Sequence, residues 1–154
     1  MKEVLSWSDC SLEEMTTPQL YAVLKLRVDV FVVEQNCPYA ELDGLDAITS
    51  TRQIFALEPD GEIVACGRVL AGNDNNPVRI GRVVVARAFR GTGLSALLMD
   101  KLMQCCSERY PSQPIKLSAQ VGVEKFYAAY GFRAVSETYL EDGIPHIDMR
   151  FEPS

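Results

Sequence analysis

A strand-like run that breaks into a glycine turn, and then into a helical pattern, is the feature that most constrains this chain. Residues 83–102 read VVVARAFRGTGLSALLMDKL, with three valines before the turn and apolar residues at helical spacing after it. The first N–H groups of a helix have no partner within it, and the helix dipole adds partial positive charge at that end. Because the glycines leave those donors open, the turn predicts a site for an anion.

Three kinds of anion-binding turn compete for this segment. A P-loop is excluded because the chain has no G-x-x-x-x-G-K-[ST]. The dinucleotide fingerprint G-x-G-x-x-A is matched literally by Gly91, Gly93 and Ala96, but it opens a βαβ unit whose second strand ends in an acidic residue. Here the turn lies past mid-chain and the following strand ends in Gln120, which leaves a phosphate-binding turn of a third kind.

Bulk composition narrows the class of protein. The 154 residues are 47% hydrophobic and 23% charged, which predicts one compact domain over residues 1–154. The net charge of −6 argues against non-specific nucleic-acid binding, which needs a basic face. No apolar run approaches the roughly 20 residues of a membrane span, and the polar N-terminus does not resemble a signal peptide. We therefore expect neither a nucleic-acid nor a membrane partner.

The cysteines predict a reducing compartment, and the single histidine argues against a metal. The five cysteines are odd in number and have no C-x-x-C spacing, and His146 is the one histidine, so zinc has too few plausible ligands. Disulfides follow redox compartment, so we expect a cytoplasmic protein. The cysteines are Cys10, Cys37, Cys66, Cys105 and Cys106.

Hydrophobic periodicity and turn signals predict an α+β order, β-α-β-β-β-α-β-α-β-β, with one right-handed crossover at the helix after the glycine turn. The predicted strands are residues 3–8, 52–58, 62–70, 78–86, 115–119, 135–140 and 145–151. The first predicted helix has Thr17 as its N-cap, with Pro18 next, and ends near residue 33. Two further helices are predicted at 94–109 and 121–130, and the second of these ends at Gly131 as a left-handed cap.

The glycine turn also resembles a known signature. Residues 90–95, RGTGLS, are similar to the R/Q-x-x-G-x-G/A motif of the GNAT acyltransferase superfamily, and EKFYAAYGF at 124–132 is similar to its F/L-Y-x-x-x-G-F helix end. FVVEQNCPYAELDGLD at 31–46 and GIPHIDM at 143–149 resemble the small ElaA-like branch. Ser95 departs from the preferred glycine or alanine, but serine is small enough to let a phosphate approach. The resemblance covers nearly the whole chain and implies the GNAT acyl-CoA N-acyltransferase fold, a mixed, mostly antiparallel sheet of about six to seven strands flanked by helices.

The resemblance implies acetyl-CoA as the acyl donor and no metal. A bulged strand would pair its backbone with the pantetheine arm at Val83, Val84 and Val85; the alternative is that these are simply buried strand residues, and both can hold. Arg87 either adds charge near the phosphates or is solvated. The pyrophosphate would be cradled where a Cβ must not intrude, by Arg90, Gly91, Thr92, Gly93, Leu94 and Ser95.

The implied chemistry is transfer of an acetyl group to a primary amine of a small molecule or peptide. By resemblance, Tyr127 protonates the leaving thiolate; the alternative is a core aromatic. The sequence does not decide which group accepts the proton of the amine. His146 is one candidate, although it lies on the more polar face of its strand, where the simpler interpretation is a solvated ring. Glu34 and Glu41 are further candidates, and ordered water would also suffice. A non-catalytic acyl-CoA-binding module is the alternative function, and a homodimer is compatible with the sequence.

An acidic loop, residues 34–50, is the candidate substrate loop because connections of this length are usually functional or disordered. Arg68 and Arg82 fall nearly opposite one another if residues 70–78 close a hairpin, and like charges across a strand pair need an anion between them. Either an acceptor carboxylate supplies it or, as we expect, the loop does. The loop carboxylates are Glu34, Glu41, Asp43 and Asp46.

Overall fold

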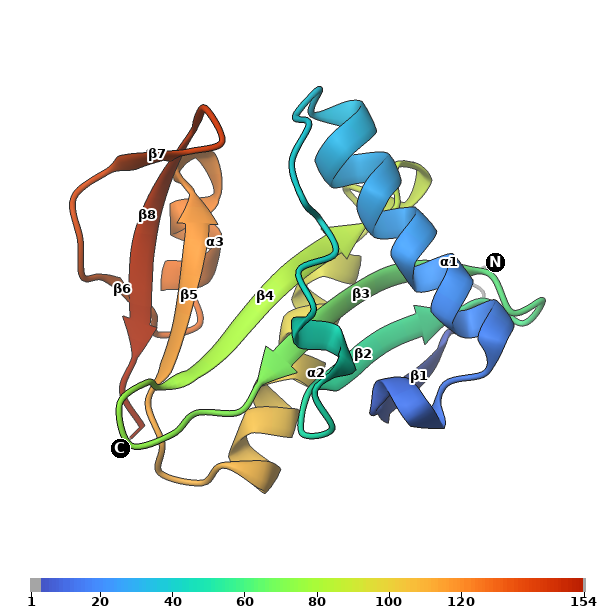
Figure 1. Cartoon of the computed structure of the whole chain (residues 1–154), viewed down its shortest axis with the longest axis horizontal. Coiled ribbons are helices and arrows are strands. Elements are labelled where there is room, and N and C mark those ends of the chain that lie inside the picture. The colour runs from blue at the N-terminus through green and yellow to red at the C-terminus, as the bar shows by residue number, and fades with distance from the viewer. Residues whose placement is uncertain (1–3, 154) are drawn as a thin grey trace.

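The computed structural model describes residues 4–153, which form an eight-stranded mixed sheet with helices on both faces (Figure 1). The strands follow the order β1-β2-β3-β4-β5-β8-β6, and β7 also pairs with β8. The strands are β1 (Ser6–Cys10), β2 (Arg52–Leu57), β3 (Ile63–Leu70), β4 (Val78–Val85), β5 (Ile115–Gln120), β6 (Arg133–Ala134), β7 (Tyr139–Glu141) and β8 (Ile144–Phe151). The α-helices are α1 (Thr17–Val28), α2 (Leu94–Arg109) and α3 (Glu124–Ala128).

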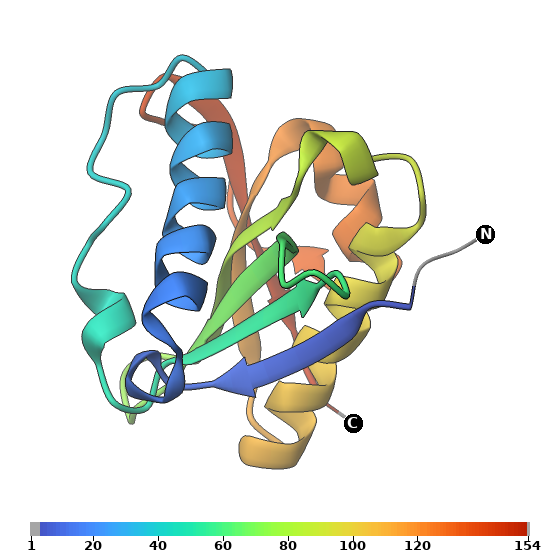
Figure 2. The same cartoon turned by 90° about the vertical axis from the view of Figure 1, so that its right-hand side faces the viewer.

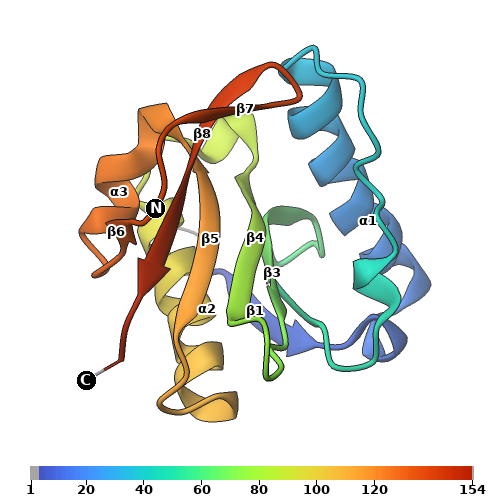
Figure 3. The same ribbon diagram turned by 60° about the vertical axis from the view of Figure 1, so that its left-hand side comes forward.

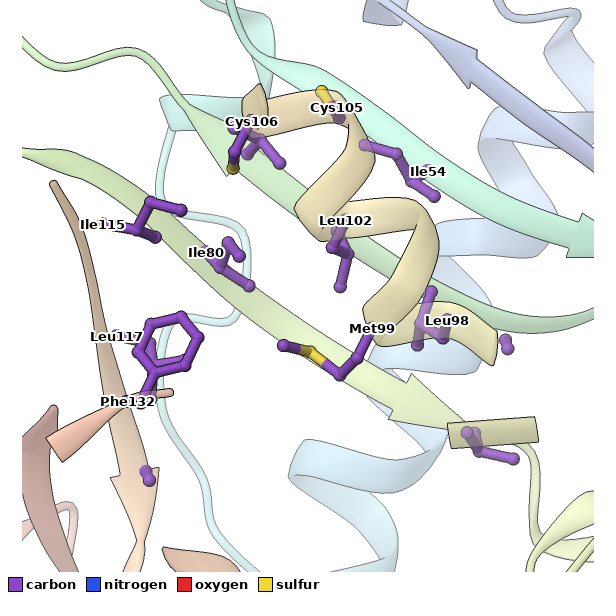
Figure 4. Packing of buried hydrophobic residues seen from close by; sticks show 14 of the residues in the cluster. Ile54, Ile80, Leu98, Met99, Leu102, Cys105, Cys106, Ile115, Leu117 and Phe132 are labelled. Carbon is purple, nitrogen blue, oxygen red and sulfur yellow. The ribbon is translucent and has the colours of Figure 1, made fainter. Parts of the chain in front are cut away.

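The turned view in Figure 2 shows α1 and α2 on opposite faces of the sheet. Two apolar clusters hold them there. On one face, Val23 and Leu26 of α1 pack with Phe55 and Val84 of the strands. On the other face, α2 buries one side against β2 to β5 (Figure 4). The buried residues of α2 are Leu94, Leu98, Met99, Leu102, Cys105 and Cys106, which recur every three or four positions.

The crossover helix is confirmed at its predicted bounds, while other boundaries are corrected. The N-cap of α1 is Thr16, not Thr17: its hydroxyl accepts from the Gln19 amide at 3.2 Å, and the Gln19 side chain accepts from the Thr16 amide at 3.1 Å. The α-helix ends at Val28 and continues to residue 34 as a wider π turn. The last predicted helix is a 3₁₀ turn over Val121–Val123 followed by the short α3, and Gly131 has the expected left-handed φ of 94°.

The sheet has eight strands rather than six to seven. The strand predicted at 135–140 is wrong over most of its length: β6 ends before it at Ala134, β7 begins only at Tyr139, and both pair with β8. The first strand begins at Ser6, and the predicted start at residue 3 lies outside the described residues. The organisation of residues 1–154 as one domain stays a prediction.

The pair β4 and β5 opens the sheet. They run parallel and pair only at Val78 with Ile115 and at Arg79 with Lys116. Beyond Arg79 the two strands no longer pair with each other, although β4 still pairs with β3 and β5 with β8. They continue to Val85 and Gln120, and Figure 3 shows them separating toward the end of the sheet where α2 begins.

A bulge in β4 lies at the edge of this opening. Arg68 of β3 pairs with Gly81 and Cys66 pairs with Val84, so Gly67 faces both Arg82 and Val83. Arg82 takes a left-handed φ of 53°, which is uncommon for a residue with a Cβ. The opening and the bulge together expose backbone that would otherwise be paired.

Candidate active site

A cleft of about 800 Å³ lies between the separated strands. Its walls come from β4 and the end of β5, from the acidic loop, from the segment leading into α3 and from the β7–β8 hairpin. Of the residues expected at the site, those that line the cleft are Glu34, Val83, Val84, Val85, Arg90, Ser95, Tyr127 and His146. The structure therefore brings both proposed roles, donor binding and catalysis, to one cavity.

The three valines combine the two roles considered for them. Val84 and Val85 are buried, Val84 in the cluster under α1 and Val85 in the cluster under α2. All three line the cleft on β4, at the edge that no longer pairs with β5 beyond Arg79. Their side chains can thus stabilise the core while their backbone groups face an unpaired edge.

The glycine turn leaves open space at the start of α2. Gly91 and Gly93 have φ of 76° and 85°, and a Cβ added at either position would meet no atom within 4 Å. Gly93 is the N-cap and offers no side chain to the first N–H groups of α2. Thr92 is tied back because its hydroxyl donates to the Phe89 carbonyl, whereas Arg87 is exposed. The turn therefore has free amide donors and room for a bulky anion.

Glu34 belongs to this turn and not to the pair Arg68 and Arg82. Its carboxylate accepts two hydrogen bonds from the Arg90 guanidinium, at 2.7 and 3.0 Å, and these lower the pKa of Glu34. Arg90 Nε also donates to the Val85 carbonyl at 3.3 Å. The expectation that Glu34 neutralises Arg68 and Arg82 is wrong, because the chain returns to the end of α1 at residue 90. Glu34 clamps the glycine turn to the π turn after α1.

The remaining loop carboxylates supply the counterions, as expected. Arg68 donates to Asp43 at 2.6 and 3.0 Å and lies 3.2 Å from Asp46. Arg82 donates to Glu41 at 2.8 Å and to Asp43 at 3.3 Å. Hydrogen bonds from Arg68 lower the pKa of Asp43 well below its usual range despite partial burial.

Sequence reasoning missed Arg27, the centre of this network. Its side chain is 1% exposed and donates to Glu41 at 2.7 Å and to Asp46 at 2.7 and 3.1 Å. Burial is the largest single influence on Asp46 and opposes its charged form, but the hydrogen bonds and charge of Arg27, the hydrogen bond from Gln53 and the charge of Arg68 together lower the pKa of Asp46. The signal was present, because Arg27 follows Val23 by four positions and precedes Val30 by three, on the buried side of the helix.

Tyr127 has features of both interpretations considered for it. Its ring packs edge-to-face on Phe126 and Phe132, with centroids 5.2 and 6.3 Å apart. Its hydroxyl forms no hydrogen bond with any residue from 4 to 153, and burial raises the pKa of Tyr127 to about 12. Packing therefore holds the ring, while the phenol stays protonated at neutral pH with no acceptor of its own among these residues.

His146 is not solvated. The β7–β8 hairpin covers it, since Tyr139 pairs with it and the two rings stack with centroids 6.2 Å apart, leaving the residue 9% exposed. The ring Nδ1 lies 2.7 Å from the Ile144 carbonyl, which can only accept, so Nδ1 carries the hydrogen. In the neutral ring Nε2 then keeps its lone pair, 3.5 Å from a carboxylate oxygen of Glu141. Glu141, a second acceptor at this end of the cleft, was also missed from sequence.

The separated parallel strands, the bulge and the open turn at a helix start define the acyl-CoA N-acyltransferase fold. A family model described as "Acetyltransferase (GNAT) domain" matches residues 23–153. The chain therefore belongs to the GNAT acetyltransferase family. It is 45% identical to Protein ElaA of Escherichia coli K12 over 150 residues, covering 97% of each chain, and 39% identical over 140 residues to a UPF0039 protein of Mycobacterium tuberculosis, covering 89% and 86%.

Solved structures agree with the assignment. The crystal structure of Escherichia coli ElaA has a TM-score of 0.90 at 44% identity and covers 97% of this chain and 100% of its own. An acyl-CoA N-acyltransferase from Pseudomonas aeruginosa has a TM-score of 0.91 at 44% identity, covering 96% and 99%. Within residues 4–153, none of the helices has the length and apolar character needed to span a bilayer.

Proposed function

We propose that this protein is an acetyl-CoA-dependent N-acetyltransferase that transfers the acetyl group to a primary amine of a small molecule or peptide by direct attack. The observation that carries the proposal is the placement of Tyr127, a protonated phenol without an internal acceptor, in the cleft that also holds the unpaired β4 backbone and the Arg90–Glu34 clamp. In this proposal the unpaired backbone of β4 binds the pantetheine arm, and the turn over residues 90–95 binds the pyrophosphate.

Three side chains have proposed roles in the reaction. As the amine nitrogen bonds to the acyl carbon and the carbon–sulfur bond breaks, Tyr127 donates its proton to the leaving sulfur. His146 accepts a proton from the amine at Nε2, and its Nδ1–H bond to Ile144 keeps that nitrogen available. Glu34 is unsuited to be the base because it is held by Arg90, and its proposed role is to position the turn.

The alternative is an acyl-CoA-binding module without turnover. It uses the same turn and strand backbone, and a phenol and an imidazole beside the acyl group would be incidental to it. The half-buried ring of Tyr127 and the buried ring of His146, both in the cleft, favour the enzyme. We also propose a cytoplasmic location, a single domain and no nucleic-acid partner, and a homodimer is compatible with these proposals.

The experiment is a thiol-release assay with acetyl-CoA over a panel of amines and peptides, together with calorimetry of CoA binding. Binding with turnover supports the enzyme, whereas binding without turnover across the panel supports the module. Absence of CoA binding would contradict both.

Gly93→Val tests the cofactor site directly. The new side chain enters the open space at the start of α2, so CoA affinity should fall tenfold or more, which corresponds to about 1.4 kcal/mol. Gly61→Val is the matched control. Gly61 has a φ of 90°, its Cβ would also meet no atom within 4 Å, and it lies in the β2–β3 hairpin. Both variants carry the same kind of backbone strain. Equal CoA affinities in the two folded variants would contradict the assignment of the turn.

A further inference from the structure

Four basic residues form a row straight across the sheet. Arg79 of β4 pairs with Lys116 of β5, Lys116 pairs with Arg150 of β8, and Arg150 pairs with Arg133 of β6. Directly paired residues of neighbouring strands lie on the same face, and adjacent positions alternate between faces. The preceding or following residues, Val78, Ile115 and Met149, are buried on the α2 face, so the row lies on the opposite face.

This part of the face has no helix over it. On that face α1 packs on β3 and β4, and Figure 1 shows β5 and β8 to one side of it, while α2 and α3 lie behind the sheet. Arg79 and Arg133 are exposed, and the side chains of Lys116 and Arg150 are 37% and 36% exposed. Arg79 also lines the cleft. The row therefore begins inside the proposed site and continues onto open surface.

The row has too few carboxylates for its charge. Lys116 lies 3.3 Å from Asp148, and Arg150 pairs with Glu152. The side chains of Arg79 and Arg133 form no ion pair or hydrogen bond with any residue that the structure describes. Like charges directly opposite each other destabilise a sheet. Two of the four cations thus lack an internal counterion.

The absence of a partner for Arg79 contrasts with the rest of the cleft. Its three other arginines, Arg68, Arg82 and Arg90, each have a carboxylate within 2.8 Å. Carboxylates are not scarce either, because the chain has 21 acidic and 15 basic residues. An arginine left unpaired at the cleft wall, beside a second cation, is suited to bind an oxygen anion in two-pronged geometry.

We propose that Arg79, with Lys116 beside it, binds an oxyanion carried by the amine acceptor. This inference rests on the proposed function and narrows its substrate class to amines that bear a carboxylate or a phosphate. Val83 lies four residues along β4 from Arg79, or about 13 Å at roughly 3.3 Å per residue. An acceptor about as long as an extended tripeptide, which spans about 10 Å, would therefore bring its amine toward the acyl group while its anion is held at Arg79.

The test uses two matched probe pairs that differ in the anion. The carboxylate pair is triglycine and triglycine amide, and the phosphate pair is 6-aminohexyl phosphate and 6-aminohexanol. Binding of each probe is measured by calorimetry at constant low ionic strength in the presence of CoA, which carries no acyl group. Thiol release with acetyl-CoA is measured in parallel. At least one anionic probe should bind tenfold or more tightly than its neutral partner, and the pair that shows this selectivity identifies the anion.

Two arginine variants locate the anion site. In Arg79→Gln the selectivity should fall below about threefold. Arg109→Gln, which removes an exposed arginine at the end of α2 on the other face, should retain it. Equal binding within both pairs, selectivity retained in Arg79→Gln, or no binding of either anionic probe would overturn the anion site.

The parallel readouts separate this inference from the proposed function. Thiol release without anion selectivity overturns the anion site alone. Selective binding that depends on Arg79, without thiol release from any probe or amine, supports the anion site and overturns acetyl transfer.

Discussion

The immediate neighbours of Tyr127 and His146 give the two side chains opposite hydrogen-bonding character. Burial without an internal acceptor keeps the Tyr127 phenol protonated, since its pKa is raised to about 12. The carbonyl of Ile144 fixes the hydrogen of His146 on Nδ1 and leaves Nε2 as an acceptor. A donor and an acceptor at one cleft are what proton transfer during amine acylation requires.

Tyr127→Phe should lower the turnover rate by about 10²–10⁴-fold, because it removes the proton donor and keeps the ring. CoA affinity and the unfolding midpoint should stay close to native. Tyr130→Phe is the control: it lies on the same segment, its hydroxyl donates to the Ala96 carbonyl at 3.0 Å, and it is not among the residues that line the cleft. Steady-state rates of both variants decide between the acid and the core aromatic. A Tyr127→Phe rate within about threefold of the native rate would contradict the acid role and would show that Tyr127 is a core aromatic.

The pH profile should also reflect the raised pKa of Tyr127. An ordinary phenol would lose its proton, and with it the acid function, near pH 10. Because burial raises the pKa to about 12, the loss of activity caused by this group should begin well above pH 10. Rates measured from pH 8 to 11, with denatured controls for protein stability, check this. A fall in the rate near pH 10 that is absent in Tyr127→Phe would show that the phenol has an ordinary pKa, and would contradict this prediction.

At the scale of elements, salt bridges to three arginines link the acidic loop to α1, β3 and β4. Arg27, Arg68 and Arg82 all donate to its carboxylates, and the bulged Arg82, with its left-handed φ, is held by Glu41 and Asp43. Because the π turn after α1 and the loop form one wall of the cleft, this network places the wall relative to β4. The loop is therefore ordered by charge more than by its own apolar residues, of which Leu42 and Ile48 are exposed.

Arg27→Met should reduce the free energy of unfolding by about 3–5 kcal/mol, because it leaves Glu41 and Asp46 buried without their main partner. Lys25→Met is the control on the same helix. Lys25 pairs with Asp29 at 2.6 Å, but the two side chains are 62% and 51% exposed, so its loss should cost about 0–1 kcal/mol. Urea unfolding of the two variants measures the difference. Similar costs for both would show that the network contributes no more than a surface pair.

At the scale of the whole molecule, salt bridges hold the acidic loop against α1, β3 and β4, beside the opening between β4 and β5. Glu34, Asp43 and Asp46 all have lowered pKa values, and each forms an ion pair with an arginine: Glu34 with Arg90, Asp43 with Arg68 and Asp46 with Arg27. Groups whose pKa is lower in the folded state stabilise it at pH values above their unfolded pKa, and that stabilisation is lost as pH falls through the folded value. The free energy of unfolding should thus decrease as the pH falls into the acid range.

Stability should therefore decline as pH falls below about 4, where these carboxylates titrate in the unfolded chain. Chemical unfolding at pH 7, 4 and 3 measures the decline. Asp43→Asn should cost stability at pH 7, and its difference from the native protein should shrink toward low pH, because a protonated aspartate resembles asparagine. A difference that is constant with pH would show that the Asp43 charge does not contribute.

The sequence alone determined the features that depend on neighbours within a few residues. The glycine turn, the helix Leu94–Arg109, the left-handed Gly131 and most strands were predicted, because strand propensity, helical periodicity and positive-φ glycines act locally. Even here a cap was misplaced by one residue, since Thr16 and Thr17 are chemically alike and only the reciprocal bonds with Gln19 distinguish them.

Only the tertiary structure decided which charges meet and which side chains are buried. The sequence predicted that the acidic loop neutralises Arg68 and Arg82, but not which carboxylate meets which arginine: Glu34 pairs instead with Arg90 across 56 residues, and Arg82 pairs with Glu41 across 41. His146 is buried because a hairpin folds over it, and the row from Arg79 to Arg133 exists because strand register aligns four residues from four strands. Register and packing depend on the whole chain at once, so the partners of a side chain follow from the complete fold and not from its neighbours in sequence.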